Sequence, residues 1–142
     1  MKNLLYAFPS KSILLILFLY NIYDFNAQTV TTLAGSTSGY ADGVGTAAQF
    51  NGCTGVTVAP NGDIYVADWL NNRIRKVTPS GVVTTIAGSN SGYADGTVSS
   101  ALFYNPMDIA IDNAGNLYIA DTGNHRIRKI TTDGMVSTLA GG

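Results

Sequence analysis

An internal repeat constrains the fold of this 142-residue chain more than any other feature. Residues 29–89 align without gaps over residues 82–142, a period of 53 residues, and nearly half of the aligned positions are identical. The pentapeptide GYADG, for example, stands at Gly39–Gly43 and again at Gly92–Gly96. A fixed period of this size is typical of proteins in which one structural unit is made several times.

Each repeat has the pattern of a small antiparallel sheet. Runs of β-branched and aromatic residues alternate with turns rich in Gly, Pro, Asn and Asp, and no stretch has helical periodicity of comparable length. The pattern predicts four strands per repeat. They are Val56–Val58, Ile64–Ala67, Arg73–Thr78 and Val82–Ala87 in the first copy, and Ile109–Ile111, Leu117–Ala120, Arg126–Thr131 and Met135–Ala140 in the second.

The third strand indicates how these sheets pack. Ile74 and Val77 are three residues apart, so on a strand they face opposite ways. A sheet with apolar groups on both faces is covered by a neighbour on each side. Four short antiparallel strands per unit, stacked face to face around an axis, make a β-propeller. We therefore expect an all-β fold with about two blades, an incomplete ring. A parallel β-solenoid is the alternative, but it usually has shorter repeats and lacks tight hairpin turns.

The strand-and-turn motifs also resemble a known family. The runs NGDIYVADWLNNRIRKVTPSG (61–81) and AGNLYIADTGNHRIRKITTDG (114–134) look like NHL repeats, the units of NHL-type β-propellers. The resemblance covers residues 29–142, as two repeats (29–81 and 82–134) and the start of a third (135–142).

Two blades are too few for a ring. A closed propeller of four to eight blades at this period needs on the order of 200–425 residues. We therefore expect either a part of a longer chain or a short protomer that completes a ring by self-association. Two blades alone leave apolar faces uncovered, so a stable monomer is not expected.

The first 27 residues have the features of a secretory signal peptide. Lys2 and Lys11 flank the start, the apolar run Ser12–Tyr20 follows, and Ala27 is a small residue at a polar junction. A membrane anchor is the alternative, but the run is only about half of the ~20 apolar residues that a span needs. Residues 28–142 are therefore expected to be secreted, periplasmic or on the cell surface, with no membrane span after cleavage.

The charges argue against a nucleic-acid partner. Removing residues 1–27 takes away two of eight basic and one of nine acidic side chains, which leaves six and eight, a net charge of −2. All six basic residues lie in the two Arg-Ile-Arg-Lys runs, where alternation sends neighbouring charges to opposite faces. We expect the Arg stems to pack between blades and their head groups to meet Asp.

Motifs for catalysis or metal binding are missing from the sequence. There is no Glu, His125 is the only histidine, and no calcium loop, nucleophile elbow or phosphate loop occurs. Asp68 and Asp121 recur at one position after the second strand, so we interpret them as structural residues that cap the hairpin. Cys53 is the only cysteine and is expected to be unreactive. We therefore predict no catalytic residue, no metal site and no cofactor.

The connections between strands suggest a binding surface. Because the chain reverses at every turn, the long GYADG connection (36–50) and the turn 69–72 should share one face, opposite the turns 60–62 and 79–81. In a purely structural interpretation the glycines permit turns, Asp42 closes one, and Tyr40 packs on the neighbouring blade. In a functional interpretation this face contacts a ligand. Its candidate residues are Tyr40, Asp42, Trp69, Asn72, Tyr93, Asp95 and His125.

We therefore expect a non-catalytic binding or scaffold module for a protein or glycan. The family resemblance implies one alternative, because NHL-type propellers include extracellular enzymes. In that case the chain would be a fragment of a lyase or lactonase-like enzyme whose catalytic residues lie in other blades.

Overall fold

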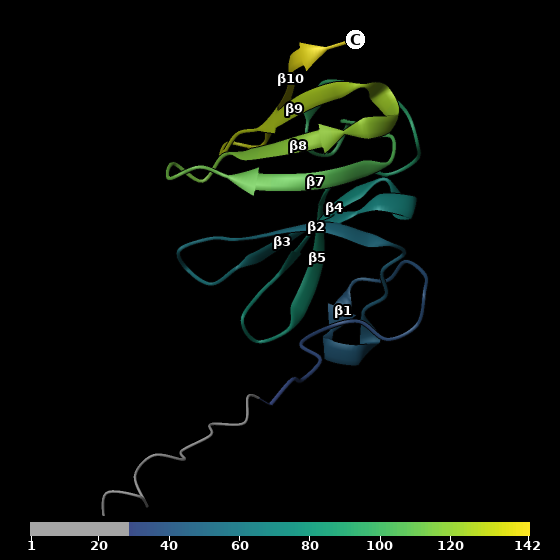
Figure 1. The fold of residues 1–142 in the computed structure, drawn as a ribbon, viewed down its shortest axis with the longest axis vertical. Helices are drawn as coiled ribbons and strands as arrows, with labels where there is room; N and C mark the ends of the chain where they lie inside the picture. Colours follow the sequence, from purple (N-terminus) through teal and green to yellow (C-terminus); the bar gives the residue numbers. More distant parts are fainter. Residues whose placement is uncertain (1–28) are drawn as a thin grey trace, which may run out of the picture. The chain divides into compact units, whose positions relative to one another are not determined.

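The structure, a computed structural model, describes residues 29–142. The predicted signal peptide, residues 1–27, lies outside the described residues. Residues 32–142 form one compact unit that contains two sheets (Figure 1). Regular structure in the described part of the chain consists of β-strands and short 3-10 turns, so the all-β prediction is confirmed.

Each repeat forms one five-stranded sheet in which all neighbouring strands are antiparallel. The spatial orders are β1-β5-β4-β3-β2 and β6-β10-β9-β8-β7. The strands are β1 (Gly43–Val44), β2 (Cys53–Val58), β3 (Ile64–Asp68), β4 (Arg73–Val77), β5 (Val82–Ala87), β6 (Gly96–Thr97), β7 (Pro106–Ile111), β8 (Leu117–Asp121), β9 (Arg126–Ile130) and β10 (Met135–Gly141), and the 3-10 turns are η1 (Gly45–Ala47), η2 (Trp69–Asn71) and η3 (Thr122–Asn124).

The sequence predicts four strands per blade, and the structure adds a fifth at the outer edge. Gly43 and Val44 pair with Val83 and Val82 of β5, and Gly96 and Thr97 pair in the same way with β10. Two residues are too few to show an alternating pattern, which is why the strand was not predicted. The last glycine of each GYADG lies in this strand, so the connection covers the edge of its own blade.

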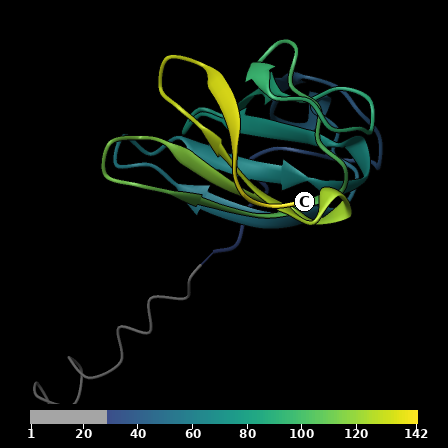
Figure 2. The same cartoon turned by 90° about the horizontal axis from the view of Figure 1, so that it is seen from above.

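The two sheets stack face to face, and both faces of the first sheet are apolar, as predicted. Ile74 is buried in a cluster shared by both sheets, and Val77 is buried in a second cluster on the opposite face. Strand β7 packs against β2 and β3 (Figure 1), and in the view from above the second sheet lies over the first (Figure 2). This arrangement is that of two consecutive propeller blades.

Phe103 is the largest apolar side chain that is fully buried between the sheets. It precedes β7 and belongs to the same cluster as Ala67, Ile74 and Ala87 of the first sheet. Its ring also lies next to Gly88, where φ is +88° and a Cβ atom would stand 2.3 Å from the carbonyl oxygen of Asn72. The small residues Ala87 and Gly88 therefore leave the space that the Phe103 ring of the second blade fills.

A buried arginine fastens the GYADG connection to the first blade. The side chains of Arg75, on β4, and Asp68, at the end of β3, are both fully buried and joined by a 2.7 Å contact between Nη1 and Oδ2. The other terminal nitrogen of Arg75 donates to Asp42 of GYADG at 2.7 Å and to the Ala41 carbonyl at 2.8 Å. Asp68 also accepts from the Asn51 backbone N–H at 2.8 Å. Both ends of the connection are thereby bound to one ion pair.

The second blade repeats this network with Arg128. Its Nη1 contacts Asp121 at 2.8 Å, and its Nη2 contacts Asp95 at 2.7 Å. The Tyr104 N–H donates to Asp121 at 2.8 Å, as Asn51 does to Asp68. The predicted pairing of Arg head groups with Asp is confirmed for Arg75 and Arg128, whereas Arg73 and Arg126 donate to the backbone carbonyls of Asn71 and Asn124. As predicted, both aspartates are structural residues of the hairpin: Asp68 accepts from Asn71 Nδ2 and Asp121 from Asn124 Nδ2, each at 2.9 Å, although neither accepts from the backbone of the 3-10 turn.

The Phe pair of the two repeats tests the packing of the blades. We expect Phe103→Ala to lower the free energy of unfolding by about 3–5 kcal/mol, because the buried ring leaves a cavity. Phe50→Ala is the matched control, since Phe50 holds the same position one repeat earlier but is partly exposed, and it should cost clearly less. Urea denaturation followed by circular dichroism measures both. Equal losses would contradict the assignment of Phe103 to the contact between blades.

Candidate functional site

The GYADG loops lie on one face of the molecule with the 3-10 turns η2 and η3, as predicted. Asn71, in η2, donates from Nδ2 to the Gly39 carbonyl at 2.8 Å, and Asn124, in η3, donates to the Gly92 carbonyl at 2.8 Å. We call this surface, made by residues 39–43, 69–72, 92–96 and 122–125, the loop-rich face.

Part of the long connection departs from the predicted placement. After GYADG the chain runs along β5, and the Gly45 N–H donates to the Gly81 carbonyl at 2.9 Å, in a turn on the opposite face. Val98 and Gly134 make the same contact in the second blade at 2.9 Å. The connection thus spans the blade edge from one face to the other, because the fifth strand carries it there.

The rings of Tyr40 and Tyr93 each make a cation–π contact with an arginine of the same blade. The Tyr40 ring centroid lies 3.9 Å from the Arg73 guanidinium carbon, and that of Tyr93 lies 4.0 Å from Arg126. The Tyr40 hydroxyl lies 3.3 Å from the hydroxyl of Thr85. The expectation that Tyr40 packs on a neighbouring blade is therefore wrong, since the fifth strand keeps GYADG on the blade that follows it in sequence.

These two rings remain accessible although they are held in place. Tyr40 is 47% exposed and Tyr93 is 46% exposed. A ring fixed by a stacked guanidinium and a hydroxyl contact loses little conformational entropy when a ligand covers it. Arg73 and Arg126 were not among the predicted site residues. Arg73 and Arg126 are the first residues of β4 and β9, directly after the turns η2 and η3. This position in the sequence could have placed both arginines on the loop-rich face.

The carboxylates of Asp42 and Asp95 both make ion pairs and hydrogen bonds within their own blades. Burial acts to raise the pKa of Asp42, but the Thr85 N–H and the Arg75 guanidinium outweigh it and hold the pKa below its usual value. Burial likewise acts to raise the pKa of Asp95, but the Arg128 guanidinium and the Thr138 N–H outweigh it and hold that pKa below its usual value. Both carboxylates are therefore ionised at neutral pH and already paired, so they stabilise the loop rather than present a free charge.

Asn72 and His125 occupy equivalent left-handed positions, with φ of 54° and 56°. The Oδ1 atom of Asn72 accepts from the Asn105 N–H of the second blade at 2.9 Å, so this side chain joins the two blades. His125 is exposed. The structure thus places His125 as a turn residue, at the position that Asn72 holds one repeat earlier.

Trp69 and Tyr104 add aromatic surface to the loop-rich face. The partly exposed Trp69 ring lies next to Gly52, whereas Tyr104 is half-exposed and lies next to Gly123. Tyr104 was not predicted, because its counterpart in the first repeat is Asn51 and the repeat gives no signal for it. Four of the seven predicted residues therefore form a Tyr–Asp pair on each blade that contacts arginines of the same blade, and the other three are Trp69 and the two left-handed turn residues.

Within residues 29–142 no group of three or more His, Cys, Asp or Glu side chains is placed to hold a metal ion. Cys53 is exposed, and partial burial of its sulfur together with the nearby Asp68 raises the pKa of the thiol. A raised pKa keeps the thiol protonated and weakly nucleophilic at neutral pH. The described residues also include no helix long and apolar enough to cross a membrane.

Comparison with known proteins agrees with this geometry. The NHL repeat model matches residues 50–77 and 103–130, one segment in each blade. NHL repeat-containing protein 2 of Gallus gallus is 43% identical over 89 residues, which are 61% of this chain and 12% of that protein. The chain therefore spans only a small part of this relative.

Two solved structures show the same fold over larger shares of this chain. An auxiliary nutrient binding protein from Bacteroides ovatus is 33% identical with a TM-score of 0.66, covering 76% of this chain and 28% of that one. A virginiamycin B lyase from Staphylococcus aureus is 20% identical with a TM-score of 0.50, covering 63% and 27%, and shares the fold alone. The two matching segments and the stacked blades show that the chain contains two NHL repeats, and that these fold as blades of a β-propeller.

Proposed function

We propose that the chain is exported and serves as a non-catalytic binding or scaffold surface for a protein or glycan. The observation that carries this proposal is the pair of half-exposed tyrosines, Tyr40 and Tyr93, each fixed on an arginine of its own blade. Aromatic rings with a polar tip suit contacts to sugar rings and to protein side chains. Their repetition presents two similar contacts on one face, which favours an extended or repetitive partner.

The nutrient-binding likeness supports a binding role. The Bacteroides ovatus protein is described as an auxiliary nutrient binding protein, and this chain shares its fold at 33% identity. The ionised carboxylates nearest the tyrosines are used in ion pairs with Arg75 and Arg128, so they are poorly suited to act as a general acid or base.

An enzymatic role is the second candidate, favoured by the fold shared with the virginiamycin B lyase. In that case the chain would contribute blades to a lyase or lactonase-like enzyme whose catalytic groups lie outside residues 29–142. A cluster of His and carboxylate side chains facing the central channel in neighbouring blades would favour this candidate over binding.

Export predicts a processed protein. Expression of the full sequence in a secreting host should give a mature N-terminus within a few residues of Gln28, because the first 27 residues have signal-peptide character. Mass spectrometry of the secreted or periplasmic fraction measures this end. Recovery of the chain only from the cytoplasm, with Met1 retained, would contradict export.

The loop-rich face predicts a one-sided response to substitution. Trp69→Ala and Tyr93→Ala should each weaken binding to a partner found by glycan-array or protein pull-down screening by about 1–2 kcal/mol, roughly 5- to 30-fold in Kd. Ser80→Ala and Asn61→Ala, in turns of the opposite face, are the controls and should leave Kd unchanged. Equal losses of affinity from substitutions on both faces would refute the site. Circular dichroism checks that all four variants keep their β content.

A further inference from the structure

Each blade carries the same cluster of four side chains beside its GYADG loop, a tyrosine, an aspartate, a threonine and an arginine. We call it the Tyr–Asp–Thr–Arg unit. Its members are Tyr40, Asp42, Thr85 and Arg73 in the first blade and Tyr93, Asp95, Thr138 and Arg126 in the second. The threonine joins the other polar groups, because Thr85 Oγ1 lies 3.3 Å from the Tyr40 hydroxyl and donates to Asp42 Oδ1 at 3.1 Å. Thr138 makes the same two contacts, each at 3.2 Å.

The exposure of the two units does not depend on which neighbouring blade covers them. The second sheet covers the first on one side only, and the first sheet covers the second on the opposite side only. Tyr40 and Tyr93 nevertheless have nearly equal exposed fractions, and the side chains of Asp42 and Asp95 are 42% and 41% exposed. The accessible surface of each unit is therefore a property of the blade itself.

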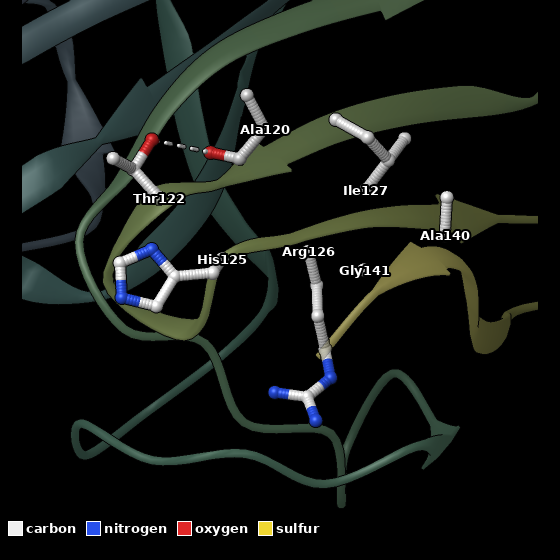
Figure 3. Close-up of a pocket in the computed structure, with 7 residues that line it drawn as sticks. All are labelled: Ala120, Thr122, His125, Arg126, Ile127, Ala140 and Gly141. Atoms are coloured by element: carbon white, nitrogen blue, oxygen red, sulfur yellow. Dashed lines mark hydrogen bonds between the residues drawn. The ribbon is translucent and has the colours of Figure 1, made fainter.

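The outward surface of each unit is the free side of an aromatic ring. The Arg73 guanidinium lies over one face of the Tyr40 ring, so the exposed part of the ring is its other face and its rim. Arg126, which points away from Ile127 across β9 (Figure 3), covers one face of Tyr93 in the same way. The face of an aromatic ring carries partial negative charge, which attracts the slightly positive hydrogens of C–H groups. A ligand with a flat array of C–H groups complements this surface.

A hydrogen-bond acceptor is left open beside the ring. An ionised carboxylate offers about four lone-pair positions, two on each oxygen. Asp42 Oδ1 accepts from the Arg75 guanidinium and from the Thr85 hydroxyl, whereas Oδ2 accepts one hydrogen bond from the described residues, from the Thr85 N–H at 3.1 Å. The charge of Asp42 is thus paired, but one position on Oδ2 can still accept from a ligand hydroxyl.

We propose that each Tyr–Asp–Thr–Arg unit binds one ring of a neutral hexose of glucose configuration. The sugar ring stacks on the free face of the tyrosine, and one of its hydroxyls donates to the aspartate. Such a ring fits because its equatorial hydroxyls form a polar rim and leave axial C–H bonds on both faces. The inference rests on the proposed binding function and selects a glycan over a protein, since aspartate is depleted at the cores of protein interfaces. The arginine is a positioning residue, because it lies on the covered side of the ring.

The test uses cellotetraose, a soluble chain of β-linked glucose units, and protein made from the full sequence with isotope-labelled tyrosine rings. NMR titration follows the ring signals of Tyr40 and Tyr93, with Tyr118, which is bonded to Asp112, as the internal control. Sorbitol is the control ligand, because it has the hydroxyls of a hexose but no ring face. The double variant Tyr40→Phe/Tyr93→Phe keeps both aromatic faces, whereas Tyr40→Leu/Tyr93→Leu replaces them with aliphatic side chains.

We expect millimolar cellotetraose to shift the signals of Tyr40 and Tyr93 but not that of Tyr118, and sorbitol to shift none of them. The double Phe variant should keep its affinity within about threefold, and the double Leu variant should lose at least about tenfold, because only the second loses the aromatic faces. Saturation-transfer NMR measures both variants, and circular dichroism checks their β content. If the double Leu variant does not fold, the single Leu variants replace it, and each should lose only its own unit.

The hexose site is overturned if cellotetraose shifts neither tyrosine signal, if sorbitol shifts them equally, or if the Phe and Leu variants lose the same affinity. The proposed binding function can survive that result. A protein partner whose affinity falls in Tyr93→Ala but not in Ser80→Ala, and which cellotetraose does not displace, would keep the loop-rich face as a binding surface and exclude the hexose.

Discussion

The buried ion pair between an arginine and an aspartate is the interaction on which each blade depends. Arg75 and Asp68 are both removed from water, which costs several kcal/mol per ion unless every group finds a partner. Partners for the terminal nitrogens of Arg75 and for Asp68 come from the connection that begins and ends beside the pair, through Asp42, the Ala41 carbonyl and the Asn51 N–H, whereas the buried Nε atom of Arg75 has no hydrogen-bond partner among the described residues. The same network holds Arg128. Folding of the connection and burial of the charges are therefore coupled.

This coupling explains why GYADG occurs twice. Its aspartate pairs with the buried arginine, its last glycine begins the edge strand, and its tyrosine stacks on a neighbouring arginine. The motif is first a structural part of the blade. Because the ring of Tyr40 remains half-exposed, the part that closes the blade also supplies the accessible surface on which the proposed binding function rests.

The sequence predicted the features that repeat with a regular period. Strand positions, the opposite faces of Ile74 and Val77, and the meeting of Arg and Asp all follow from alternation and from the 53-residue period. The edge strand at Gly43–Val44 was not predicted, because it has two residues and is defined by its pairing with β5. The same omission misplaced Tyr40, since only the edge strand decides to which blade the loop belongs. Tyr104 was missed because its counterpart is Asn51.

The most direct test of this account is native-state hydrogen exchange in the parent protein and in Arg75→Lys, followed by NMR. A lysine ammonium cannot reach Asp68, Asp42 and the Ala41 carbonyl together, so the connection should loosen. The account predicts that the amide protons of Asn51 and Thr85, which donate to Asp68 and Asp42, are protected in the parent protein. In the variant both should lose protection, while the amide proton of Tyr65 in β3 keeps it. Unchanged protection of Asn51 and Thr85 in the variant would contradict the account.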